Sequence, residues 1–190
     1  MRLAVLVSGQ GSLLEAMIAQ EMPISLILAD RQCRGIEIAT SAGLKTTVTL
    51  RTDYSKNFDR VGFTAEIAGI LGENKIDLVA MAGFMTILAA PIFKQYRGRI
   101  LNTHPSLLPA FPGDHAVRDA LAFGVKVTGC TIHVATEQVD EGPIIAQEPV
   151  RVYPEDTPET LHERIKEVER KLYPAVIRDI MEGRRVLPTV

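Results

Sequence analysis

The sequence predicts an α/β fold in which a mostly parallel sheet of about seven strands is doubly wound, with helices on both faces. Short runs rich in Val, Ile and Leu alternate with longer segments of helical period. Most of the short runs are apolar without polar alternation, as expected for strands covered on both faces. With 190 residues, 46% of them hydrophobic, the chain suits one core, so we expect a single domain over 1–190.

The expected strands are Leu3–Val7, Ile24–Ala29, Thr46–Leu50, Leu78–Met81, Arg99–Asn102, Val127–Val134 and Ile144–Val150. The expected helices are Ser12–Gln20, Ile36–Ala42, Asp59–Asn74, Leu88–Lys94 and His115–Phe123, followed by a long helix that begins near Pro158. The start of the long helix is marked by Thr157 as cap and by Glu159 at the positive end of the helix dipole. Pro174 should kink or stop it, because proline removes a backbone hydrogen bond.

Charge and cysteine content exclude several classes of function. The net charge is −2 with Lys and Arg scattered along the chain, which disfavours nucleic acid as a partner. Cys33 and Cys130 have neither disulfide-scaffold nor metal-site spacing, so we expect a reducing compartment and no metal. The apolar run Leu3–Val7 is too short for a signal peptide or a membrane span. A soluble cytoplasmic protein without a membrane partner is expected, and a homodimer is left open.

A glycine loop at Ser8–Ser12 follows the first strand and opens a helix. Its backbone N–H groups and the helix N-terminus favour an anion, typically a phosphate. Gly9, Gly11 and the later Asp30 also fit a dinucleotide-binding fold, but Leu14 stands where that motif needs a third glycine. A monophosphate site is therefore favoured over a dinucleotide site and over a turn without ligand.

Three prolines stiffen the segment Asn102–Gly113, which follows the fifth expected strand. Such a loop presents an amide at Asn102 and an imidazole at His104. This pair suits acyl transfer, because the amide donates to a developing oxyanion and the imidazole moves protons. A lone histidine is more often structural, so this interpretation depends on the context of the loop.

The polar turn Thr136–Pro143 separates the last two strands and reads most simply as a solvated connection. Asp140 in this turn has a second interpretation, in which it reaches His104 and favours the charged imidazole. His133 is expected to be a structural imidazole within a strand, and His162 to face solvent. For His115, function and structure are about equally expected.

The segment Ala82–Leu88 leaves the fourth strand as an apolar run with one glycine. Taken alone, its apolar composition predicts that the segment belongs to the hydrophobic core. The alternative is a hydrophobic slot for a flat ring, with backbone amides supplying specificity.

Taken together, these motifs resemble those of the phosphoribosylglycinamide formyltransferases. The resemblance is carried by Asn102-Thr103-His104-Pro105-Ser106-Leu107-Leu108-Pro109, Phe111-Pro112-Gly113, Ser8-Gly9-Gln10-Gly11-Ser12, Ala82-Gly83-Phe84-Met85, and Asp140 before Gly142-Pro143. The motifs occur in the order of that family and cover the chain from Leu3 to about Ile180. The family implies a Rossmann-like formyltransferase fold.

The resemblance also implies site residues and substrates. It makes Asn102, His104 and Asp140 the catalytic set, and 10-formyltetrahydrofolate and glycinamide ribonucleotide the substrates, without a metal. The implied ribonucleotide-binding residues are Gly11, Ser12, Leu13, Pro105, Lys166 and Glu169, with Glu169 on the ribose hydroxyls. The implied folate-binding residues are Met85, Thr86, Ile87, Leu88 and Val139, together with Asn102 and Asp140, and His115 and Lys56 are further candidates.

Four positions depart from the family pattern. Leu13 stands for the usual Asn, Thr86 and Ala110 for basic residues, and Lys56 is the nearest counterpart of an expected Arg. The change at Leu13 leaves the backbone amide available for phosphate, and the other three concern the acidic tail of the folate more than the chemistry. Two related classes, methionyl-tRNA formyltransferases and formyltetrahydrofolate deformylases, share the Asn-x-His and Asp residues but differ in the loop after His104. A nucleotide-binding module without formyl chemistry is the rival of a different class.

Overall fold

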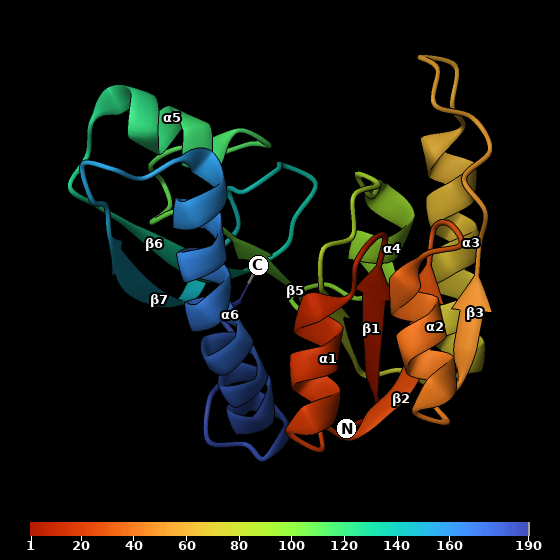
Figure 1. Cartoon of the computed structure of the whole chain (residues 1–190). Helices are drawn as coiled ribbons and strands as arrows, with labels where there is room; N and C mark the ends of the chain where they lie inside the picture. Colours follow the sequence, from red (N-terminus) through yellow and green to blue (C-terminus); the bar gives the residue numbers. More distant parts are fainter. Residues whose placement is uncertain (190) are drawn as a thin grey trace. The chain divides into compact units, whose positions relative to one another are not determined.

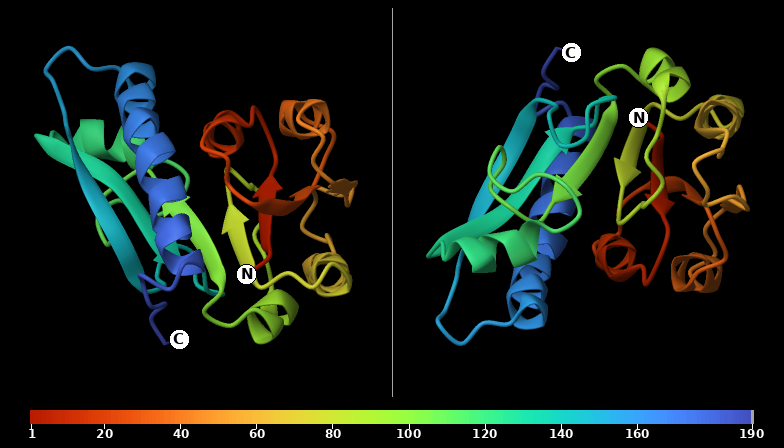
Figure 2. Two further views of the ribbon diagram at one scale, coloured as in Figure 1. Left: turned by 90° about the horizontal axis from the view of Figure 1, so that it is seen from below. Right: turned by 90° about the horizontal axis from the view of Figure 1, so that it is seen from above.

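The first of two compact units spans Met1–Leu101 in the computed structural model, which describes residues 1–189. Its elements are β1 (Leu3–Val7), α1 (Ser12–Ala19), β2 (Ile24–Ala29), α2 (Arg34–Ser41), β3 (Thr46–Val48), α3 (Arg60–Glu73), β4 (Leu78–Met81) and α4 (Ala90–Gln95). Within this unit, α1 and α2 cover one face of the strands, and α3 and α4 cover the other (Figures 1 and 2). All five residues of β1 are fully buried, because β1 lies between β2 and β4 and helices cover both faces of these strands (Figure 2). This burial explains the absence of polar alternation.

The second unit begins at Asn102, within strand β5 (Ile100–His104). It continues through α5 (Ala116–Phe123), β6 (Val127–Val134), β7 (Ile144–Arg151) and α6 (Pro158–Met181). Helix α6 packs along β6 and β7 and against α5 (Figure 1). The core of this unit contains Val117, Cys130, Val150, Leu161 and Ile165.

Seven strands follow the order β3-β2-β1-β4-β5-β6-β7. The pairs β3–β2, β2–β1, β1–β4 and β4–β5 are parallel, whereas β6 and β7 pair antiparallel. The expected doubly wound, mostly parallel sheet of seven strands is confirmed. The expectation of a single domain over 1–190 stays a prediction.

Most element boundaries match the expected ones to within two residues, and two differences change the interpretation of the chain. Strand β5 continues to His104 and does not end at Asn102. The β-branched Thr103 suits this extension. Asn102 and His104 are therefore strand residues, and only the segment after His104 is a loop.

Pro174 does not stop the last helix, which continues to Met181. The residues around and after Pro174 are buried: Tyr173, Val176, Ile177 and Ile180 are each at most 5% exposed. Their burial offsets the hydrogen bond that proline removes, because each large apolar side chain contributes roughly 1.5–3 kcal/mol when buried.

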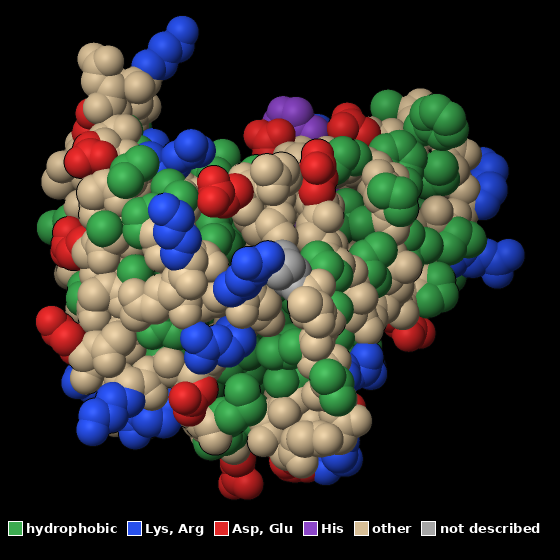
Figure 3. All heavy atoms as spheres, turned by 180° about the vertical axis from the view of Figure 1, so that it is seen from behind, with side chains coloured by type: hydrophobic (Ala, Val, Ile, Leu, Met, Phe, Trp, Pro, Cys, Tyr) green, Lys and Arg blue, Asp and Glu red, His purple; other side chains and the backbone are tan. Residues whose placement is uncertain are grey.

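Charged side chains of both signs are interspersed over the face shown in Figure 3. Exposed apolar side chains occur at the end of α5 and the start of β6, where Phe123 is 80% and Val127 50% exposed. None of the helices formed by residues 1–189 is long and apolar enough to cross a membrane.

Candidate active site

The glycine loop between β1 and α1 has the geometry of an anion site. Gly11 is the N-cap of α1, with φ of 74° and no side-chain cap. The first intrahelical bond runs from the Glu15 N–H to the Gly11 carbonyl, so the preceding N–H groups of the first turn remain available. Leu13 and Leu14 are buried at 5% and 0% exposure. At Leu13 the backbone, and not the side chain, is therefore the group that can face a phosphate.

Gly11 also tolerates no side chain, which gives a testable prediction. A Cβ at Gly11 would lie 2.8 Å from Gly35 Cα, whereas one at Gly43, which also has a positive φ, would meet nothing within 4 Å. We expect Gly11→Ala to destabilise the protein by about 2–4 kcal/mol and Gly43→Ala by about 1 kcal/mol, since only the first adds a backbone clash to the left-handed strain. Chemical denaturation measures both, and equal losses would contradict the crowding at Gly11.

Asp30, the residue that suggested a dinucleotide, is fully buried. Its carboxylate accepts hydrogen bonds from Arg31 Nε at 2.9 Å, from Arg31 Nη2 at 3.0 Å and from Thr86 Oγ1 at 2.7 Å. Burial raises the pKa of Asp30, but the hydrogen bonds from Arg31, Thr86 and Ser8 outweigh it and hold the pKa below its usual value. A carboxylate engaged in this way is not available to ribose hydroxyls, so the dinucleotide interpretation loses its acidic residue.

The sequence left two interpretations of the segment 85–88, hydrophobic core and a slot for a flat ring, and the structure shows features of both. Thr86 and Leu88 are 1% and 4% exposed, whereas Met85 and Ile87 are 66% and 51% exposed. Ser8 Oγ accepts from the Met85 N–H. Within residues 1–189, the N–H groups of Thr86, Ile87 and Leu88 have no acceptor. The segment therefore presents apolar side chains and open amides, as a site for a flat polar ring requires.

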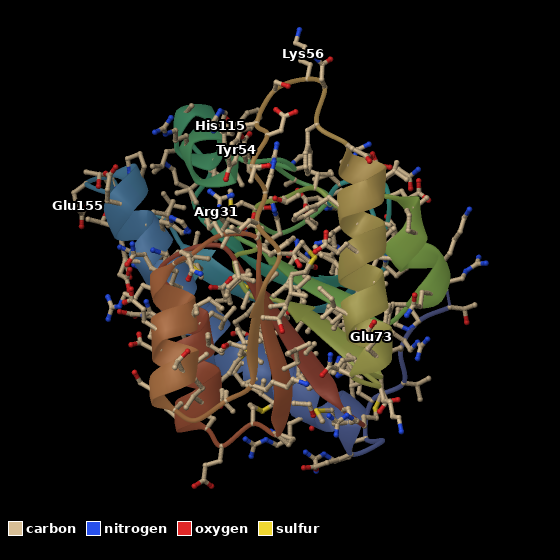
Figure 4. The ribbon with its side chains drawn as sticks, turned by 90° about the vertical axis from the view of Figure 1, so that its right-hand side faces the viewer. Arg31, Tyr54, Lys56, Glu73, His115 and Glu155 are labelled. Atoms are coloured by element: carbon tan, nitrogen blue, oxygen red, sulfur yellow. The ribbon has the colours of Figure 1, made fainter. Side chains whose placement is uncertain are left out.

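Sequence reasoning missed Arg51 as the basic group beside this segment. Its guanidinium lies 4.3 Å from the ring centroid of Phe58 and 4.7 Å from that of Tyr54, and Nη1 is 3.5 Å from Thr86 Oγ1. Lys56, the candidate from sequence, is exposed at the tip of its loop and points outward (Figure 4). Figure 4 also shows Tyr54 beside Arg31, whose Cζ is 5.5 Å from the ring centroid. The family resemblance implied an Arg before the Phe58-Asp59 pair but pointed to Lys56 as its nearest counterpart.

The second unit gathers the expected catalytic residues into one buried cluster. Asn102 and His104 lie two apart on β5, so their side chains share one face. His104 Nδ1 lies 3.2 Å from Asp140 Oδ2, and His104 Nε2 is 2.8 Å from the Phe111 carbonyl, to which it can donate. The side chains of His104 and Asp140 are 5% and 6% exposed. The contact between His104 and Asp140 suggested by the sequence is present.

His133 belongs to the same cluster, although sequence alone favoured a structural role. Asn102 Nδ2 lies 3.2 Å from His133 Nε2, and His133 Nδ1 is 3.1 Å from the Val134 carbonyl. Asp140 Oδ1 is 3.6 Å from His133 Nε2. His133 thus both satisfies its own hydrogen bonds and links Asn102 to Asp140.

Asp140 is held in an unusual backbone conformation and as a carboxylate. Its φ is 60°, in the left-handed region that few non-glycine residues adopt. Burial raises the pKa of Asp140, but the contact with His133, the hydrogen bond from the Gly113 N–H and the charge of His104 together lower it below the usual value. The Gly113 N–H donates to Asp140 Oδ2 at 2.9 Å. These donors keep Asp140 ionised beside His104.

The loop that follows β5 is tied to β6 and β7 by hydrogen bonds. Thr131 Oγ1 donates to the Ser106 carbonyl at 2.6 Å and accepts from the Leu108 N–H at 3.0 Å. Gln147 Nε2 donates to the Leu108 carbonyl at 2.8 Å. The Phe111 carbonyl on this loop is the partner of His104. The hydrogen bonds that fix the position of this loop therefore also fix the orientation of the His104 ring.

The remaining expected site residues differ in accessibility. On α6, Lys166 lies 3.6 Å from Glu163, and Glu169 accepts from Thr103 Oγ1 at 2.9 Å. Val139 is 51% exposed. A cavity of about 280 Å³ is lined by Pro105, Asp114, His115, Ala116, Val117, Arg118, Pro158, Glu159 and His162. His115 has 62% of its side chain exposed, and its Nε2 lies 3.8 Å from Asp114 Oδ1.

The donor set of the described residues suits acid/base chemistry. Asn102 supplies an amide donor and His104 an imidazole braced by a buried carboxylate, which are the groups that stabilise an oxyanion and move a proton. Among residues 1–189, no group of three or more His, Cys, Asp or Glu side chains is arranged to hold a metal ion.

Comparison with known proteins places the chain in a family. The formyl transferase family model matches residues 1–177. The chain is 47% identical over 182 residues to a phosphoribosylglycinamide formyltransferase of Mycobacterium tuberculosis, which covers 93% of this chain and 83% of the relative. It is 36% identical over 187 residues to the Bacillus subtilis protein of that name, covering 95% of this chain and 94% of the relative.

A solved structure agrees with these relatives. The crystal structure of glycinamide ribonucleotide transformylase 1 from Symbiobacterium toebii matches with a TM-score of 0.89 and 41% identity, covering 99% of this chain and 91% of that chain. Family model, sequence relatives and structure all name the same class of enzyme. The chain therefore belongs to the formyl transferase family, among the phosphoribosylglycinamide formyltransferases.

Proposed function

We propose that this chain transfers the formyl group of 10-formyltetrahydrofolate to the amine of glycinamide ribonucleotide, a step of purine biosynthesis. The observation that carries the proposal is the cluster of half-buried Asn102 with the buried side chains of His104 and Asp140, in which Asp140 lies 3.2 Å from the imidazole. Such a cluster supplies an oxyanion donor and a braced proton donor. Membership of the phosphoribosylglycinamide formyltransferases supports the choice of the two substrates.

The substrate amine is itself the nucleophile, so the proposed reaction needs no covalent enzyme intermediate. The amine attacks the formyl carbon, and a carbon–nitrogen bond forms. The Asn102 amide and the His104 Nε2–H, which exchanges the Phe111 carbonyl for the substrate, stabilise the tetrahedral oxygen. The bond from carbon to N10 of the folate then breaks. His104 passes a proton to N10 as N10 leaves, and it regains a proton from the amine through a water held by Asp140.

Substrate binding is assigned to further residues in each unit. In the first unit, the backbone of Gly11, Ser12 and Leu13 takes the phosphate, and the segment 85–88 takes the pterin ring through its open amides and exposed apolar side chains. In the second unit, Pro105 and Lys166 contribute to the ribonucleotide site, Glu169 takes the ribose hydroxyls, and Val139 contributes to the folate site. His115 is not assigned a role.

A coupled assay tests the proposal. The purified chain is mixed with 10-formyltetrahydrofolate with and without glycinamide ribonucleotide, and both deformylation of the folate and the formylated product are measured. The proposal expects folate turnover that requires the ribonucleotide and equals product one for one. Folate turnover without the ribonucleotide would identify a hydrolase instead, and no turnover in either mixture would overturn the proposed reaction.

Arg51 leads to a second prediction, on the acidic tail of the folate. Its guanidinium stacks on Phe58 and Tyr54, and within residues 1–189 no carboxylate pairs with it as a salt bridge. We expect Arg51→Gln to raise the KM for 10-formyltetrahydrofolate about tenfold, since a charge-assisted hydrogen bond contributes roughly 1.5–3 kcal/mol. The KM for the ribonucleotide should not change. Lys56→Gln is the matched control, and a larger effect at Lys56 than at Arg51 would return the role to Lys56.

A further inference from the structure

Three side chains of the second unit form a chain of hydrogen bonds behind the catalytic face of β5. Thr103 on β5 donates from Oγ1 to Glu169 Oε1 on α6 at 2.9 Å, and the same Oγ1 lies 3.3 Å from Cys130 Sγ on β6. A hydroxyl has one proton, so with that proton directed to Glu169, the Cys130 S–H is the donor to Thr103. Burial raises the pKa of the Cys130 thiol to about 12, and the thiol keeps this proton at neutral pH.

Side chains of β5 point alternately to its two faces, so this one strand contributes to two clusters of side chains. Residues 102 and 104 point to one face of the strand, and residue 103 points to the other. Asn102 and His104 thus meet His133 and Asp140, while Thr103 meets Glu169 on α6. The strand that presents the catalytic side chains also sets the position of the Thr103 hydroxyl.

Lys166 and Arg170 are cations near Glu169, and each also pairs with Glu163 on α6. Lys166 lies 3.6 Å from Glu163 and Arg170 lies 2.8 Å from it. Burial raises the pKa of Glu169, opposed by the hydrogen bond from Thr103 and by the charges of Lys166 and Arg170. Thr103 fixes one carboxylate oxygen of a long side chain that otherwise has three free torsions, and this leaves the second oxygen to accept from a ligand.

We propose that Thr103 is a positioning residue that holds the Glu169 carboxylate in the orientation that receives the sugar hydroxyls of the ribonucleotide. The inference rests on the proposed function, which assigns Glu169 to the ribose. A fixed carboxylate loses less conformational entropy when the sugar binds, so the contribution of Thr103 belongs to ribonucleotide binding and not to folate binding or to formyl transfer.

The test is a set of variants of the full chain, assayed with both substrates. Thr103→Val keeps the shape and removes the donor, and we expect it to raise the KM for glycinamide ribonucleotide about tenfold, in the range of a lost hydrogen bond to a charged group. The KM for 10-formyltetrahydrofolate and kcat should change less than about twofold. Thr103→Ser, which retains the hydroxyl, should restore most of the ribonucleotide KM.

Thr128 provides a matched control, because its Oγ1 is buried on β6 without a hydrogen-bond partner among the described residues. Thr128→Val should leave both KM values unchanged. In a double-mutant cycle, Thr103→Val should add little to the effect of Glu169→Gln, since both changes remove one interaction. Additive effects, or an unchanged ribonucleotide KM in folded Thr103→Val, would overturn the inference.

The pH dependence gives a readout that loss of packing alone would not move. Without the Thr103 donor, the pKa of Glu169 should rise further, so the acid limb of the ribonucleotide KM profile should move to higher pH. An acid limb that stays in place would count against Thr103. Activity of the unmodified chain separates the two proposals: if that chain forms no product, the proposed function fails, whereas normal product with a normal Thr103→Val refutes only the positioning role.

Discussion

Replacing His104 by Gln is expected to lower kcat about 1,000-fold, within the range of 10²–10⁴ that general acid/base groups contribute. Gln retains an N–H that can donate to the Phe111 carbonyl, the partner of His104 Nε2 at 2.8 Å. It cannot transfer a proton. The substitution therefore separates proton transfer from the support that His104 gives to the loop after β5.

His162→Gln is the matched control, because His162 is an exposed histidine on α6. It should leave kcat within about twofold of the unmodified chain, as expected for a surface change outside the cluster of Asn102, His104 and Asp140. Steady-state kinetics with both substrates measures the two variants, and thermal unfolding monitors their folding. Near-full turnover of a folded His104→Gln protein would remove His104 from the mechanism.

The positions of the central strands could be predicted from the sequence for a physical reason. Strands such as β1 are buried on both faces, so their positions carry only apolar residues. The end of β5 could not be predicted from apolar composition. Asn102, Thr103 and His104 are polar residues that continue the strand, and their polarity reflects the cluster they join.

The two ends of helix α6 depend on different interactions. A local interaction can be recognised in the sequence, whereas a tertiary one cannot. Thr157 forms a capping box with Thr160, and this start of α6 was predicted correctly because the cap is a local interaction. The continuation past Pro174 depends on the burial of Tyr173 and Ile177 against the rest of the second unit. No local rule contains that information, and of the two expected outcomes, a kink or a stop, the stop was wrong for this reason.

Within the candidate site, residue types were predictable and partners were not. Strand ends that meet at one sheet edge made a contact between Asp140 and His104 one of two interpretations, whereas the link from His133 to Asn102 depends on how β6 aligns beside β5. Arg51 was missed because it reaches Phe58 and Thr86 across an irregular segment. Thr103 was passed over because it lies between two residues with more evident chemistry.

The second large effect is expected at Asp140. We expect Asp140→Asn to lower kcat about 100- to 1,000-fold, because an amide neither braces the imidazole of His104 electrostatically nor holds the transfer water as a carboxylate does. Asn is the suitable replacement, since Asp140 has φ of 60° and Asn tolerates the left-handed region. Asp140→Ala should retain equally little activity and should also be less stable.

The same substitution has an expected effect on stability at low pH, and its sign follows from the lowered pKa of Asp140. A carboxylate whose pKa is lower in the folded than in the unfolded chain contributes stability above its unfolded pKa, near 3.9, and loses it as pH falls through the folded value. Asp140→Asn removes this contribution, so its unfolding free energy should fall less steeply below about pH 4 than that of the unmodified chain. Urea unfolding between pH 3 and pH 7, at intervals of roughly one pH unit, measures how the unfolding free energy of each protein changes with pH. Parallel curves would mean that His133, Gly113 and His104 do not stabilise the ionised form of Asp140, and the bracing of His104 by a carboxylate would then need another source.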